Sequence, residues 1–357
     1  MRNICGFIFI LGLISCAHGT IGKNPVGVKA FHYVDSTRTN WIDEGPRPLE
    51  TTVWYPAAFG SKEERHEISI FRTGTYSKNA EIRQDGKRRP LILLSHGTGG
   101  SAFSLSWFAE ALARKGYIVA AVNHHGNTGA EPKYLLPGFV LWWERPRDMS
   151  KVLDAILQEP FFSNTIDPNK IGIAGFSLGG YTALSCVGAK LVFEKWETYS
   201  AENPTEPISR LPPEANFSID DARAFLATDE RATASLLHAD DSYLDPRIKA
   251  AFVMAPVLSP LLDAESLQKI TAPVMITVGS EDDQSLAQKY DVPLAADIPN
   301  SNLVILPSAS HYTFLAEGNL YGKLFARKYT IDTNRISRRQ AHESVGNGAA
   351  AFFDKNL

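Results

Sequence analysis

Ser177 is the residue whose surroundings most clearly suggest chemistry, because it stands between two glycines in the segment Gly175–Gly179. An apolar run precedes this segment and a helix-forming run follows it, so Ser177 is expected at a sharp strand-to-helix turn. Glycines remove the side chains that would clash in such a turn, and the helix start directs N–H groups toward the serine. The pattern predicts a nucleophile. The alternative is a glycine-rich turn without a chemical role.

A serine hydroxyl is a weak nucleophile until a base removes its proton. Along the chain, the expected order of the catalytic residues is serine, acid, histidine. Only His311 and His342 follow both Ser177 and the acidic cluster at residues 281–283. His311 lies in a small polar loop directly after an apolar run. His342 lies in the polar start of the last predicted helix, where a histidine is usually solvated. We therefore predict His311 as the base.

Three acidic residues, Glu281, Asp282 and Asp283, follow the apolar run "PVMITVG". Asp282 has Gly-x-x-Asp spacing from the glycine that ends this run. Asp283 could instead cap a helix starting near Gln284. We predict that Asp282 is the acid, with the role of accepting the Nδ1–H of His311 and stabilising the imidazolium.

The loop "SHGTGG" follows another buried apolar run and is rich in glycine. Such a loop can supply a backbone N–H to a developing oxyanion. The predicted oxyanion donors are the N–H groups of Thr98 and Leu178. His96 is predicted to have a structural role in this loop rather than to serve as the base.

Apolar runs alternate with helical patterns along most of the chain, which predicts an α/β fold with a mostly parallel sheet covered by helices on both faces. Residues 57–89 are polar and are predicted as a surface excursion. Strands are predicted at 26–34, 49–56, 90–97, 117–126, 170–177, 248–256, 272–280 and 302–311, and helices at 104–116, 144–158, 178–189 and 339–355.

About sixty residues separate Cys186 from Ile248, whereas a simple crossover needs a dozen or so. This excess predicts a cap or lid insertion at about 190–246 within a single domain that covers 20–357. Ser218, three residues before Asp221, fits a capping box and indicates that the insertion contains helices.

Residues 1–19 fit a secretory signal peptide, with a basic residue, a short apolar run and small residues. Two processing hypotheses remain open: cleavage after an Ala-His-Gly site, or a lipobox "LISC" that leaves a lipidated Cys16 as the first residue. Both predict export to the periplasm or the medium, and the second predicts peripheral membrane association. Cys186 is then the one cysteine left apart from Cys16, which excludes a disulfide framework.

The composition is that of a globular protein, with 44% hydrophobic and 21% charged residues and a net charge of −3. No basic excess favours nucleic acid as a partner. The adjacent His124 and His125 lack further ligands at metal-binding spacing, so neither a metal nor another cofactor is predicted. Phe139, Trp142 and Trp143 have two interpretations, as the lining of an acyl pocket or as packing of a loop onto a helix.

These motifs resemble the α/β-hydrolase superfamily and, within it, the bacterial dienelactone-hydrolase-like group related to platelet-activating-factor acetylhydrolases. The matching segments are "LETTVWYPA", "PLILLSHGTGG", "IDPNKIGIAGFSLGG", "DPRIKAAFVMAP", "APVMITVGSEDD" and "SASHYTF". Two features depart from the group. Dienelactone hydrolases use a cysteine nucleophile and lack a long insertion, and no headgroup site typical of phospholipid substrates is evident here.

Together these patterns predict an exported serine hydrolase of the α/β-hydrolase fold. Its substrate is expected to be a small-molecule or lipid-like carboxylic ester, cleaved through an acyl-enzyme. A serine peptidase or amidase with the same triad is one alternative. A binding protein on an inactive hydrolase scaffold is the other, although no triad residue is missing from the sequence.

Overall fold

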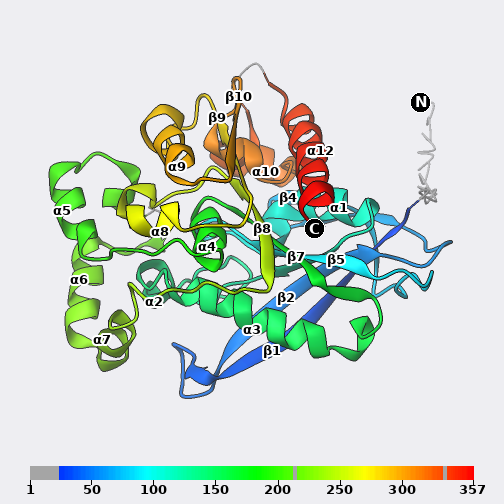
Figure 1. Ribbon diagram of the computed structural model, residues 1–357, viewed down its shortest axis with the longest axis horizontal. Coiled ribbons are helices and arrows are strands. Elements are labelled where there is room, and N and C mark those ends of the chain that lie inside the picture. The colour runs from blue at the N-terminus through cyan, green and yellow to red at the C-terminus, as the bar shows by residue number, and fades with distance from the viewer. Residues whose placement is uncertain (1–23, 212–214, 333–335) are drawn as a thin grey trace, which may run out of the picture.

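The chain is built around a ten-stranded sheet, in the order β10-β9-β8-β7-β5-β6-β2-β1-β4-β3. The computed structural model describes residues 24–211, 215–332 and 336–357 (Figure 1). The predicted signal peptide and Cys16 lie outside the described residues. The strands are β1 (Val26–Thr39), β2 (Pro46–Pro56), β3 (Glu64–Ile68), β4 (Phe71–Lys78), β5 (Arg89–Ser95), β6 (Ile118–Val122), β7 (Ile166–Phe176), β8 (Ile248–Met254), β9 (Val274–Gly279) and β10 (Ser301–Leu306).

Six neighbouring strands, from β6 to β10 across the sheet, pair in parallel. Their side chains alternate between the two faces, so that Leu91 and Leu93 join one apolar cluster while Ile92 and Leu94 join the other. Because both faces are covered, the central strands β5 and β6 carry continuous hydrophobic runs, whereas the edge strand β10 has exposed residues along one side. The predicted α/β fold with a mostly parallel sheet is confirmed.

The antiparallel edge of the sheet departs from the sequence-based prediction. β1 pairs with β2 over Val26–Asp35, and residues expected as a surface excursion instead form β3 and β4. β4 joins the sheet beside β1 through Gly27 and Val28. The prediction of an excursion for 57–89 is therefore wrong, since part of this stretch extends the sheet.

Helices cover both faces of the sheet. α1 and α12 pack with one apolar cluster, and α3 and α4 with the other. The helices are α1 (Ser106–Arg114), α2 (Leu136–Val140), α3 (Glu144–Gln158), α4 (Leu178–Cys186), α5 (Lys195–Glu202), α6 (Ile219–Thr228), α7 (Glu230–Leu236), α8 (Ala264–Gln268), α9 (Val292–Asp297), α10 (Leu320–Phe325), α11 (Arg327–Thr330) and α12 (Arg338–Asn356). No helix in the described part of the chain combines the length and apolar character that crossing a bilayer requires.

The stretch between α4 and β8 contains α5, α6 and α7, which lie together at one side of the molecule (Figure 1). The predicted capping box is present, because the Ser218 hydroxyl accepts from the Asp221 N–H at 3.0 Å. Trp196 of α5 is buried and its ring lies 5.4 Å from that of Trp142. This contact attaches the inserted helices to the loop that precedes α3.

Candidate active site

Ser177 occupies the turn between β7 and α4, in a backbone conformation that few non-glycine residues adopt. Its φ is 55° and its ψ −119°. A Cβ on Gly175 would lie 1.9 Å from the Gly179 carbonyl oxygen, and one on Gly179 would lie 2.0 Å from the Ser95 carbonyl oxygen. Both glycines are therefore required by close backbone approach. The strained turn presents Ser177 at the carboxyl end of the parallel sheet.

Three buried side chains from the ends of three strands form one hydrogen-bonded chain. His311 begins the short helix η7 (His311–Phe314) after β10, and its Nε2 lies 3.0 Å from the Ser177 Oγ. Its Nδ1 lies 2.9 Å from Asp282 Oδ2, just beyond β9. With the imidazole proton on Nδ1, His311 donates to Asp282 and its Nε2 accepts the Ser177 hydroxyl proton. The structure thus brings together the three residues singled out from the sequence.

Asp282, and not Asp283, is the acidic residue turned toward His311. Its Oδ1 also accepts the backbone N–H groups of Gln284 at 2.8 Å and Ser285 at 2.6 Å. Asp283 is exposed. The alternative in which Asp283 caps a helix near Gln284 is wrong, since the next helical turn begins at Ala287.

The loop after β5 passes beside the candidate nucleophile. A Cβ on Gly97 would lie 3.2 Å from the Ser177 Cβ, and Thr98 follows with its side chain exposed. Among the described residues, neither the Thr98 N–H nor the Leu178 N–H donates to another group. Two unpaired backbone donors next to a serine can receive a developing oxyanion.

A buried arginine holds this loop from behind. Arg145 of α3 donates from Nη1 to the His96 carbonyl oxygen at 2.7 Å. His96 accepts at Nε2 from the His124 N–H at 3.1 Å, and burial and the nearby Arg145 charge hold the pKa of His96 well below its usual value. The neutral His96 thus lies within the framework of the loop, and its hydrogen bonds in the described part of the chain go to Gly97, His124 and Arg145.

Beneath the loop lies a buried polar network that sequence reasoning missed. His124 lies 2.8 Å from the Ser95 Oγ through Nε2 and 2.9 Å from Asp148 Oδ2 through Nδ1. Arg38 and Arg47 both donate to Asp148 and hold its pKa well below the usual range, against the opposing effect of burial. The charges are paired internally, as buried charges must be.

The two adjacent histidines have separate protein partners, Asp148 for His124 and Glu131 for His125. His125 contacts Glu131 through Nδ1 at 2.7 Å. Within residues 24–211, 215–332 and 336–357, no three His, Cys, Asp or Glu side chains are grouped as a metal site requires.

His342 differs from the expectation of a solvated residue. It is buried, its ring stacks on Trp107 at 3.9 Å, and its Nε2 donates to the Thr313 carbonyl oxygen at 3.0 Å. Burial, assisted by Arg338, lowers the pKa of His342 to about 3. The expectation was wrong because α12 turns this residue toward η7, where it supports the backbone next to His311.

The two tryptophans before α3 pack against the inserted helices. Trp143 donates from Nε1 to the Ser235 Oγ at 2.9 Å, and Trp142 contacts Trp196. For these two residues the structure favours packing over pocket lining.

Phe139 belongs to a different arrangement, a row of aromatic rings that begins at the loop beside Ser177. Its ring lies 5.3 Å from Tyr134 and 6.0 Å from Phe217 of the insertion. Tyr134 in turn donates its hydroxyl to the Gly99 carbonyl oxygen at 2.8 Å. The row therefore connects the candidate oxyanion loop to the insertion.

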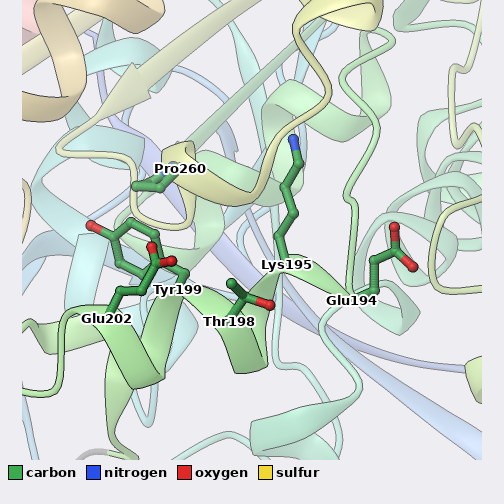
Figure 2. Close-up of a pocket in the computed structure, with 6 residues that line it drawn as sticks. All are labelled: Glu194, Lys195, Thr198, Tyr199, Glu202 and Pro260. Carbon is green, nitrogen blue, oxygen red and sulfur yellow. The ribbon is translucent and has the colours of Figure 1, made fainter.

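A hollow of about 440 Å³ lies elsewhere, against α5, and Figure 2 shows α5 side chains and Pro260 around it. A neighbouring hollow of about 360 Å³ shares Tyr199 and Pro260 with the first. Neither is lined by Ser177, His311 or Asp282. The lining of neither hollow includes a histidine, so the chemistry favours the serine turn as the candidate active site.

Comparison with known proteins agrees with this architecture. Residues 91–319, more than half of the chain, match the alpha/beta hydrolase family. The chain belongs to the alpha/beta hydrolase family. A ferulic acid esterase from Streptomyces cinnamoneus has a similar fold, with a TM-score of 0.60 and 20% identity over 94% of this chain and 91% of that one.

Curated relatives of this alpha/beta hydrolase include both peptidases and an esterase. It is 27% identical over 136 residues to dipeptidyl aminopeptidase BIII from Pseudoxanthomonas mexicana, which is 37% of this chain and 19% of that protein. It is 24% identical over 143 residues to cutinase est1 from Thermobifida alba, which is 40% of this chain and 45% of that protein. The chain matches less than half the length of these relatives. The narrower resemblance to the dienelactone-hydrolase-like group stays a prediction.

Proposed function

We propose that this protein is a serine hydrolase that cleaves carboxylic esters through an acyl-enzyme. The observation that carries the proposal is the hydrogen-bonded chain from the Ser177 Oγ through His311 to Asp282, beside the unpaired N–H groups of Thr98 and Leu178. Nucleophile, base, orienting acid and oxyanion donors are the parts that acyl transfer requires.

In the proposed reaction, the Ser177 Oγ attacks the ester carbonyl carbon while His311 Nε2 takes the hydroxyl proton. The tetrahedral oxyanion is held by the Thr98 and Leu178 N–H groups. Collapse breaks the bond to the alcohol oxygen, which leaves with the proton from His311. Water then attacks the acyl-enzyme with His311 again as base, and the carboxylic acid leaves Ser177 free. Asp282 keeps the imidazole oriented and stabilises its positive charge.

The proposed substrate is a small-molecule or lipid-like ester with an apolar portion. The row of Tyr134, Phe139 and Phe217 supports this choice, because aromatic rings near the oxyanion loop favour apolar groups. The insertion would then act as a lid that selects the acyl chain or the leaving group. No cofactor is needed for this chemistry.

A serine peptidase or amidase is the second candidate, since the same groups cleave both bonds and peptidases are among the relatives. The third, a binding protein on an inactive scaffold, is disfavoured because Ser177 and His311 are within hydrogen-bond distance. These candidates differ in measurable activity, and a substrate panel separates them.

The test is turnover of p-nitrophenyl esters of increasing acyl length beside dipeptide anilides, by wild type, Ser177→Ala and Ser163→Ala. Ser163 is an exposed serine that precedes β7, at the opposite end of this strand from Ser177, and serves as the matched control. Loss of roughly 10³-fold or more in ester turnover is expected for Ser177→Ala alone. Preferred cleavage of anilides would favour the peptidase, and no turnover of either class would favour the scaffold.

We further propose that the protein is exported, either secreted or periplasmic, with peripheral membrane association if Cys16 is lipidated. The support is the signal-like composition of residues 1–19. Cell fractionation and labelling with a palmitate analogue, in wild type and Cys16→Ser, test this. Label on wild type alone supports the lipid anchor, and a soluble, unlabelled wild-type protein contradicts it.

A further inference from the structure

We infer that Asp291 is a positioning residue that acts in its protonated form, by donating a hydrogen bond that ties the loop of Asp282 to the loop behind Ser177. The inference rests on the proposed function, because the geometry it protects is that of the triad. Asp291 ends the π-helix η6 (Ala287–Asp291) and is fully buried. Its side-chain hydrogen bond in the described part of the chain is to Ser285 and not to the candidate nucleophile.

The Ser285 hydroxyl has two oxygen neighbours but only one proton to donate. Its Oγ lies 2.6 Å from the Pro256 carbonyl oxygen and 2.9 Å from Asp291 Oδ2. A carbonyl oxygen only accepts, so the proton of Ser285 points to Pro256 at the shorter distance. The second contact is then a hydrogen bond only if Asp291 Oδ2 carries a proton and donates it to Ser285.

The surroundings of Asp291 favour the neutral acid. Its Oδ1 has no hydrogen-bond partner among the described residues. Burial, together with the charge of Asp282, raises the pKa of Asp291 to about 7, against the opposing effects of Ser285 and His311. An unpaired carboxylate in this position would be costly to bury.

The other titratable groups near η6 point away from Asp291 toward the insertion. Lys289 lies 2.6 Å from Glu206, and the Tyr290 hydroxyl donates to the same carboxylate. Tyr199 of α5 contacts the Tyr290 hydroxyl at 3.0 Å. Lys289, the cation of η6, is therefore paired with Glu206, and Asp291 has no ion pair within η6.

The hydrogen bonds of Ser285 connect both sides of the site. Its backbone N–H donates to Asp282, while its hydroxyl holds Pro256. Pro256 packs against α4 directly behind the nucleophile, since a Cβ on Gly180 would lie 2.9 Å from the Pro256 Cα. When Asp291 loses its proton, Ser285 turns its hydroxyl to the carboxylate and Pro256 loses its donor. The spacing between Asp282 and Ser177 is then less firmly held.

The experiment measures kcat and KM from about pH 5.5 to 9.5 for wild type, Asp291→Asn, Asp291→Leu and the exposed control Asp283→Asn. An Asn amide donates to Ser285 at every pH, whereas Leu never does. We expect the wild-type kcat to fall by about threefold or more on the alkaline side of pH 7, with KM unchanged. Asp291→Asn should keep its plateau, Asp291→Leu should be low throughout, and Asp283→Asn should follow wild type. An alkaline decline that is the same in Asp291→Asn as in wild type would overturn the inference, as would no decline in wild type.

A spectroscopic readout tests the inference even if the Asp291 variants fail to fold. Burial also raises the pKa of Glu110, so the protein used is Glu110→Gln, which removes this second buried carboxyl. Near pH 6, surface carboxyl groups are ionised, so an infrared band of a protonated carboxyl that vanishes by about pH 8.5 in this protein reports Asp291. Absence of this band would contradict the inference. The same measurement on Ser177→Ala needs no turnover, so failure of the proposed hydrolase function and failure of the Asp291 inference remain distinguishable.

Discussion

Replacing Asp291 with asparagine should change how the free energy of unfolding depends on pH. Asp291 has a pKa raised to about 7 in the folded protein from 3.8, chiefly by burial. The folded chain therefore holds a proton that the unfolded chain releases between these values, and wild type loses stability as pH rises through that window. Between pH 5 and pH 8 the wild type loses the stabilisation that corresponds to about two pKa units, which is about 2.7 kcal/mol at 1.36 kcal/mol per unit. Above pH 7 little further change is expected from this group.

The assay is urea unfolding followed by tryptophan fluorescence at pH 5 and pH 8, for wild type, Asp291→Asn and Asp283→Asn. Any effect of the amide on the free energy of unfolding that does not depend on pH is the same at both pH values. We therefore compare the difference in unfolding free energy between variant and wild type at pH 8 with the same difference at pH 5. Asp291→Asn should gain on the order of 2–3 kcal/mol relative to wild type between pH 5 and pH 8. Asp283→Asn, at an exposed position, should show almost none. A gain below about 0.5 kcal/mol for Asp291→Asn would refute the reasoning, because it would mean that the folded protein already holds Asp291 ionised at pH 5.

Three further predictions concern the site and the insertion. Asp282→Asn should lower kcat by about 10²–10⁴ through the wrong imidazole tautomer, whereas Asp283→Asn should cost little; steady-state kinetics on one ester checks both, and the reverse order would reassign the acid. Arg145→Met removes the donor to the His96 carbonyl oxygen and should lower kcat by about tenfold or more with little change in KM, since a displaced loop weakens oxyanion binding; an unchanged kcat would show that the loop holds its shape alone. Replacing residues 195–236 with a short linker should alter the ratio of activity on short and long esters, and an unchanged ratio would assign substrate selection to another part of the site.

Local sequence signals predicted the elements that depend on local physics. The helix expected over 144–158 spans Glu144–Gln158 in the structure, because its apolar residues repeat along one face. The turn at Ser177 was recognisable because its two flanking glycines are required there: a Cβ on either would lie about 2 Å from a backbone carbonyl oxygen. Gly-x-x-Asp spacing likewise distinguished Asp282 from its neighbour.

Long-range packing explains what the sequence did not disclose. β3 and β4 are only partly buried, so their side chains lack a clear alternation. The place of β4 in the sheet is set by pairing with the distant β1, and β3 pairs with β4 in turn. The sequence suggested a surface position for His342, whereas in the structure α12 packs its ring against Trp107. Asp291 gave no signal at all in the sequence, since its raised pKa follows chiefly from burial and from the charge of the more distant Asp282.

The most direct test of the central claim is mass spectrometry of the protein after reaction with a fluorophosphonate probe. The probe labels a serine only when a neighbouring base activates it, so the label reports the proposed nucleophile without a choice of substrate. We expect one adduct, on the peptide that contains Ser177, absent from Ser177→Ala and strongly slowed in His311→Ala. No adduct on the folded wild-type protein, or an adduct at another serine that persists in Ser177→Ala, would contradict it.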